Sequence, residues 1–158
     1  MSSILQNLSD YNEHAVPSGK GKSIGIAVAE WHKDITFELL RGCVATLEKF
    51  DVQTDSIFIT YVPGTFELPF AAKRLAETHH LSSVICLGCV IKGETDHDIY
   101  INQSVAFALQ QLNLQYEIPF IFGVLTPNTE EQAKDRAGGK HGNKGVEAAI
   151  TALKMGRI

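Results

Sequence analysis

The chain has 158 residues and a formal net charge of −4 at pH 7, with 14 Lys and Arg against 18 Asp and Glu. Apolar residues make up 44% and charged residues 20%, which is typical of a globular domain and excludes a disordered segment. The acidic balance argues against a nucleic-acid partner. No apolar stretch approaches the roughly 20 residues that span a bilayer, so we expect no membrane partner either.

Residues 1–158 are expected to form a single domain, in which residues 1–22 are a polar arm and residues 23–158 an α/β core. The first 14 residues lack the cationic start and long apolar run of a signal peptide. Three cysteines in such a chain predict reduced thiols and a cytoplasmic protein.

Strands and helices alternate along the predicted core. Short apolar runs predict four strands, at residues 23–29, 56–62, 83–91 and 119–125. The first is followed by helical spacing over 34–50. The second is followed by a helix that Thr65 can cap, with Pro69 in its first turn.

The last two strands are also followed by helical patterns. Ile101, Val105 and Leu109 share one helix face after the third strand. After the fourth, residues 129–132 (TEEQ) have the capping-box pattern, and a final amphipathic helix follows residue 145. Nearly all-apolar strands separated by helices predict a four-stranded parallel sheet with helices on both faces.

Ligands of such sheets bind beyond the carboxyl ends of the strands. The segments expected there are polar or aromatic: 30–32 (EWH), 63–67 (PGTFE) and 92–97 (KGETDH), with Phe122 near the end of the fourth strand. A further segment, 136–145 (RAGGKHGNKG), combines four glycines with Arg, Lys and His in an acidic chain. Glycines bring backbone N–H groups close to a ligand and arginine matches a phosphate, so we expect an anion to bind there.

Two other interpretations of single motifs are less favoured, and a third stays open. Cys86 and Cys89 form a CxxC pair, but they lie inside an apolar strand where positions three apart point to opposite faces, so we expect no redox or zinc chemistry. Residues 96–98 (DHD) offer metal ligands without a second cluster, and we expect no metal and no cofactor. Arg136 alone is equally consistent with capping its own helix.

Four segments, VPGTFELP, GCVIKGETDH, FGVLT and RAGGKHGNKG, occur in the order and spacing of one known family. The chain resembles 6,7-dimethyl-8-ribityllumazine synthases, the penultimate enzymes of riboflavin biosynthesis, over residues 23–155. The resemblance implies a flavodoxin-like α/β sandwich and a transferase. Its reaction condenses 5-amino-6-(D-ribitylamino)uracil with 3,4-dihydroxy-2-butanone 4-phosphate to 6,7-dimethyl-8-ribityllumazine, with release of phosphate and water.

The resemblance also implies roles for particular residues. Those matching the pyrimidinedione and ribityl site are Trp31, Thr65, Phe66, Glu67, Cys89, Val90, Ile91 and Lys144. Those matching the butanone phosphate site are Glu94, Thr95, Phe122 and Arg136. His97 matches the proton-transfer residue, and the neighbouring Asp98 stands where the family more often has an aromatic residue.

The family further implies a homo-oligomer with shared active sites, namely a pentamer and an icosahedral shell of twelve pentamers, with riboflavin synthase as a candidate guest inside the shell. Two alternatives stay open from the residues. One is another phosphosugar enzyme on the same fold, and the other is a non-catalytic flavin-binding or shell-forming relative. An archaeal riboflavin synthase shares the fold, but the segments containing His97 and Arg136 favour the lumazine enzyme.

Overall fold

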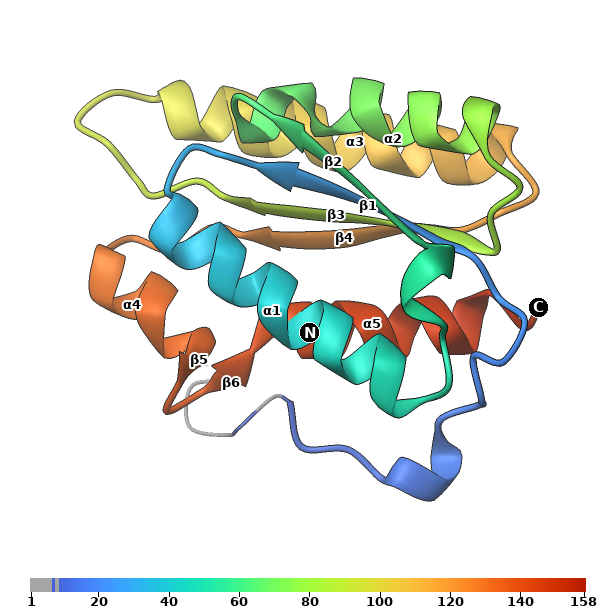
Figure 1. Ribbon diagram of the computed structural model, residues 1–158. Coiled ribbons are helices and arrows are strands. Elements are labelled where there is room, and N and C mark those ends of the chain that lie inside the picture. Colours follow the sequence, from blue (N-terminus) through green and yellow to red (C-terminus); the bar gives the residue numbers. More distant parts are fainter. Residues whose placement is uncertain (1–6, 8) are drawn as a thin grey trace.

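The computed structural model describes residue 7 and residues 9–158. Its main sheet has four parallel strands, which are β1 (Ile24–Ala29), β2 (Ile57–Val62), β3 (Ser83–Cys89) and β4 (Phe120–Leu125). Their order across the sheet is β2-β1-β3-β4 (Figure 1). The predicted four-stranded parallel sheet is confirmed, and each predicted strand begins within one residue of the observed one.

Helices cover both faces of this sheet. The longer ones are α1 (Lys33–Lys49), α2 (Leu68–Thr78), α3 (His97–Gln115) and α5 (Lys144–Met155), and α4 (Glu130–Asp135) is short. Short 3-10 helices are also found in the described residues, at Glu13–Ala15, Thr54–Ser56 and Thr65–Glu67. Figure 1 shows α2 and α3 on one face, and α1 and α5 on the other. This three-layer arrangement is the predicted flavodoxin-like α/β sandwich.

The core is divided between the two faces by the alternation of side chains along the strands. In β1, Ile26 and Val28 belong to the apolar cluster under α1 and α5, while Ala27 belongs to the cluster under α2 and α3. Strand β2 departs from the expected full burial, because it is an edge strand: Ile59 is 39% and Tyr61 is 49% exposed.

Two helix starts were predicted, and one of them differs from the prediction. Thr129 caps α4 as expected, since its hydroxyl accepts from the Gln132 N–H at 3.2 Å. Thr65 does not cap α2, because it lies in the preceding 3-10 helix and its buried hydroxyl donates to the Cys89 carbonyl oxygen at 3.4 Å. Pro69 lies in the first turn of α2 as predicted.

The basic segment, residues 136–145, was expected to be a loop, and the structure shows a small hairpin instead. Strands β5 (Ala137–Gly139) and β6 (Gly142–Asn143) pair antiparallel. Gly142 has φ 82°, a left-handed conformation that L side chains avoid. The glycines of this segment therefore shape a turn within the protein.

The described part of the N-terminal arm lies against the α1 and α5 side. Val16 is buried in the cluster under these helices. The Ser9 hydroxyl accepts from the Asn143 N–H at 2.5 Å and donates to the Asn143 carbonyl at 3.0 Å. The rest of the predicted arm, residues 1–6 and 8, lies outside the described residues. Within residue 7 and residues 9–158, no helix is both long and apolar enough to cross a membrane.

Gly145→Ala is expected to destabilise the fold. A Cβ atom at Gly145 would lie 1.8 Å from the Leu39 carbonyl oxygen in α1, so α1 and α5 would have to separate. Overpacking of this kind typically costs about 1–3 kcal/mol. Gly93→Ala is the control, because its Cβ would meet no atom within 4 Å. Equal denaturation midpoints for the two variants would contradict the close contact.

Candidate active site

The loops at the carboxyl ends of β1, β2 and β3 enclose a groove of about 530 Å³. The groove is lined by predicted site residues Trp31, Thr65, Phe66, Glu67, Cys89, Val90, Ile91, Thr95 and His97. It is also lined by residues outside the predicted site set, namely His32, Pro63, Gly64, Gly93, Asp98 and Ile101. The groove therefore lies where ligands of open parallel sheets bind.

Trp31 stands at the mouth of the groove on a turn that is held at its backbone. The Glu30 N–H donates to the Val62 carbonyl at 2.8 Å, and the Trp31 N–H donates to the Pro63 carbonyl at 3.0 Å. The indole itself is 70% exposed and meets the His32 ring edge to face, with centroids 6.2 Å apart. An exposed aromatic face on a fixed turn suits stacking of a flat heterocycle.

The floor of the groove is apolar and tightly built. Cys89 and Val90 are buried at the end of β3. The Val90 N–H donates to the Leu125 carbonyl at 2.9 Å, which fixes this strand end against β4. Burial raises the pKa of the Cys89 thiol to about 12, so the side chain is a neutral thiol at physiological pH and no nucleophile.

One wall of the groove is polar and is formed by the start of α3. His97 is the first residue of this helix, and it is exposed to the groove. The preceding Asp96 makes no side-chain capping bond, so the first N–H groups of α3 and the positive end of its dipole favour an anion nearby. Asp98 also lines the groove, and its Oδ1 atom is buried with no hydrogen-bond partner among the described residues. An unpaired buried acceptor is costly and is suited to receive a donor from a ligand.

Arg136 and Lys144 do not line this groove. Arg136 Nη1 donates to the His141 carbonyl at 2.8 Å, and its Nη2 atom lies 2.8 Å from Glu147 Oε1. Lys144 Nζ donates to Glu147 Oε2 at 3.1 Å. The guanidinium thus spans the hairpin to α5. Arg136 is also the C-cap residue of α4, because its backbone N–H donates to the Ala133 and Lys134 carbonyls, so the capping alternative holds for the backbone while the guanidinium binds elsewhere.

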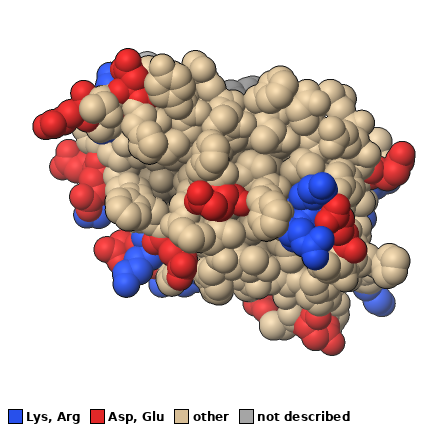
Figure 2. Space-filling model, turned by 90° about the horizontal axis from the view of Figure 1, so that it is seen from above, with Lys and Arg blue, Asp and Glu red and all other residues tan. Residues whose placement is uncertain are grey.

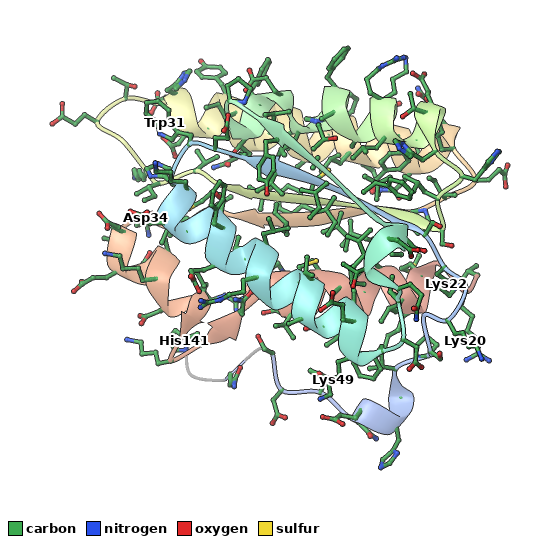
Figure 3. The ribbon with its side chains drawn as sticks, in the orientation of Figure 1. Lys20, Lys22, Trp31, Asp34, Lys49 and His141 are labelled. Carbon is green, nitrogen blue, oxygen red and sulfur yellow. The ribbon has the colours of Figure 1, made fainter. Side chains whose placement is uncertain are left out.

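The basic hairpin and the groove occupy the same end of the molecule. In Figure 3, Trp31 and His141 lie at this end, with the start of α1 between them. Within one chain, the residues predicted for the phosphate therefore fall into two groups: Thr95 lies in the groove, and Arg136 lies outside it.

Phe122 and Glu94 also lie outside the groove. Phe122 lines a second hollow, of about 550 Å³, beside the edge strand β4 with Asn113 and Met155. Glu94 is exposed in the loop before α3. One chain therefore brings together the residues predicted for the pyrimidinedione and ribityl group, except Lys144, but only part of those predicted for the butanone phosphate.

The three cysteines are free and buried. Cys86 and Cys89 belong to different apolar clusters on the two sides of the sheet, as the strand periodicity predicted. Among the residues that the structure describes, no group of three His, Cys, Asp or Glu side chains is placed to hold a metal ion.

His32 and Asp98 are groove residues that were not among the predicted site residues, although Asp98 was expected to be able to orient or charge the His97 imidazole. The sequence did indicate that both residues lie near the site, because His32 follows Trp31 and Asp98 follows His97. His32 has φ 59°, an uncommon left-handed conformation for a residue other than glycine, and this turn starts α1. Such conformations cluster at functional sites.

The comparisons with known proteins agree on one family. The model of the 6,7-dimethyl-8-ribityllumazine synthase family matches residues 21–158. Proteins named 6,7-dimethyl-8-ribityllumazine synthase from Parabacteroides distasonis and Porphyromonas gingivalis are 54% and 53% identical to the chain. The matches cover 98% of this chain and 97% and 96% of those proteins. A protein of the same name from Cytophaga hutchinsonii is 51% identical, over 98% of this chain and 97% of its own length.

The buried thiols are expected to resist alkylation in the folded protein. A pKa near 12, as burial gives to Cys86 and Cys89, leaves roughly one thiol in ten thousand ionised at pH 8. Burial raises the pKa of Cys43 as well. Intact-mass spectrometry after iodoacetamide at pH 8 should show no modification, whereas the protein in denaturant should take up three labels. Rapid labelling of one thiol in the native protein would contradict the buried environment of that thiol.

Proposed function

The chain belongs to the 6,7-dimethyl-8-ribityllumazine synthase family, and from this we infer that the groove at the strand ends is its active site. The protein is a transferase of riboflavin biosynthesis. It condenses 5-amino-6-(D-ribitylamino)uracil with 3,4-dihydroxy-2-butanone 4-phosphate to 6,7-dimethyl-8-ribityllumazine, releasing phosphate and water. The observation that carries the site assignment is that one groove collects Trp31, residues 65–67, the end of β3 and His97.

We assign the pyrimidinedione ring to the face of Trp31. The ring is flat and apolar on its faces, and it would stack on the exposed indole above the floor formed by Cys89, Val90 and Ile91. The ribityl chain carries hydroxyl groups, and we place it along residues 65–67, where the Glu67 carboxylate is available to accept from them. Lys144 lies outside the groove of its own chain, so we propose that it reaches this site from another copy.

His97 is proposed to move protons during the reaction. The primary amine of the pyrimidine condenses with the butanone carbonyl to an imine with loss of one water. Phosphate is then eliminated, and the second nitrogen closes the ring with loss of a second water. Each step transfers a proton near neutral pH, which imidazole is suited to do. Holding both substrates in one groove supplies a further part of the acceleration.

The phosphate is proposed to bind between the start of α3 and Arg136. Thr95 and the free N–H groups at the helix start suit an anion. Glu94 is exposed and lies outside the groove lining, so its carboxylate need not approach the phosphate. Arg136 would supply the cation, and Phe122 would wall the butanone pocket. Both of the latter lie outside the groove of their own chain, so they would come from a neighbouring copy.

A ring of copies accounts for this division of the site. Figure 2 looks down on the face formed by α2 and α3, and much of this face carries no charged side chain. Several large apolar side chains are exposed on it, namely Phe66, Phe70, Tyr100, Phe107 and Leu114. Surfaces of this kind commonly bind another protein. We propose a pentamer in which each groove is completed by the adjacent copy.

The finer features implied by the family remain proposals. They are assembly of twelve pentamers into a shell, riboflavin synthase as the guest inside it, and a cytoplasmic location. The alternatives of a non-catalytic relative or a different phosphosugar enzyme are not favoured, because the full-length relatives share the lumazine synthase name. The direct test of the function is the appearance of lumazine absorbance and fluorescence from the two substrates.

Arg136→Ala is expected to weaken use of the butanone phosphate much more than use of the pyrimidine. Loss of a charge-assisted hydrogen bond costs about 1.5–3 kcal/mol, which raises the KM for the phosphate substrate by roughly tenfold or more. Steady-state titration of each substrate in turn measures the two effects. Equal losses for both substrates would count against the phosphate assignment.

Mixing two impaired variants is expected to restore activity if the groove is shared. His97→Asn and Arg136→Ala damage different copies of each site, so some interfaces in mixed rings carry both intact residues. Random mixing in equal amounts, through co-refolding, gives about one quarter of the wild-type activity for a head-to-tail ring. Activity no higher than the mean of the two separate variants would show that both residues serve the site of the same chain. An active monomer, detected by light scattering, would show the same.

A further inference from the structure

We propose that Glu147 is a positioning residue that holds Arg136 in the orientation needed to bind the phosphate of the substrate. This inference rests on the proposed function, in which Arg136 meets the phosphate. It adds a role for Glu147, which lies in the first turn of α5.

The carboxylate of Glu147 is shared between two cations, one on each oxygen. Oε1 lies 2.8 Å from Arg136 Nη2, and Oε2 accepts from Lys144 Nζ at 3.1 Å. The hydrogen bond from Lys144, three residues earlier in the same helix, limits rotation of the carboxylate. Oε1 is thereby kept facing the guanidinium.

Arg136 is held at two of its nitrogens by different elements. Nη1 donates to the His141 carbonyl in the hairpin, while Nη2 meets Glu147 in α5. A planar guanidinium fixed at two points has a defined orientation, and its remaining N–H groups are free for a ligand. Without Glu147, the hairpin carbonyl alone would hold the group.

This cluster differs from the other ion pairs of the same region in burial. The side chains of Arg136 and Glu147 are 18% and 19% exposed, whereas Lys134 and Glu130 in α4 are 62% and 66% exposed. Glu147 Oε1 is buried and makes no hydrogen bond within the described residues, so its ion pair with Arg136 is its only support there. Partly buried pairs are screened less by solvent than surface pairs, so this one is able to fix a side chain.

The charges of the cluster also fit an anionic ligand. One carboxylate stands against Arg136 and Lys144, which leaves one net positive charge. The carboxylate reduces the repulsion between the two cations while they remain close together. A phosphate would then meet a cluster that is preorganised and still positive.

A purely structural role for Glu147 predicts a different result. Glutamate in the first turn of a helix, with a lysine three residues away, stabilises the helix on its own. That role would lower thermal stability on substitution without changing the affinity for an anion. The two roles are therefore separable by measuring anion binding.

The test compares Glu147→Gln with Arg136→Ala and with their double variant, using inorganic phosphate as a competitive inhibitor against the butanone phosphate. Glutamine keeps the shape of the side chain and removes its charge. We expect Glu147→Gln to raise the inhibition constant of phosphate roughly tenfold, within the range for directly interacting side chains. In the Arg136→Ala background it should have no further effect. Glu130→Gln, which removes the exposed pair with Lys134, is the control and should leave the inhibition constant unchanged.

Each other outcome decides between the two claims. If Arg136→Ala does not weaken phosphate inhibition, the phosphate site of the proposed function fails. If Arg136→Ala weakens it and Glu147→Gln does not, only the role of Glu147 is overturned. A lower inhibition constant for Glu147→Gln would also overturn it, because Glu147 would then be withholding Arg136 from the anion. So would an equal effect of Glu147→Gln with and without Arg136.

Discussion

The site depends on one constraint, which is that β1 pairs in parallel with both β2 and β3 without a stagger between the strand ends. Ile24 pairs with Ile57 of β2 and with Ser83 of β3, so the three strands begin at one level. Because they are also of similar length, their carboxyl ends finish together, and the loops that follow are forced into one place. The groove is the direct result of this alignment, which in turn requires helices over both faces to bury the strands.

The regular part of the fold was predictable from the sequence because burial on two faces leaves a strong pattern. β1 and β3 are buried along their whole length, and each appears as an unbroken apolar run. The hairpin at residues 136–145 was not predicted, since glycine-rich segments suit a ligand loop and a turn equally well. Only the positions of α1 and α5 show that Gly145 is required for the contact of two helices.

The candidate site also has a part that was predictable from the sequence and a part that was not. Trp31, Thr65 and His97 follow strands directly, so their convergence follows from the topology. The environment of Arg136 could not be predicted, because its partner Glu147 is brought to it by tertiary packing of α5. Asp98 could be located at the groove from the sequence, but its buried, unpaired oxygen is a property of the packed helix start.

The turn that carries Trp31 has a consequence for the entropy of binding. Its backbone is already tied to the end of β2 through Val62 and Pro63, although the indole is exposed to solvent. A ligand that stacks there has no loop to order and restricts only the two side-chain torsions of the tryptophan. Immobilising one side chain costs about 0.5–1.5 kcal/mol, and the fixed turn adds no further cost for ordering a loop.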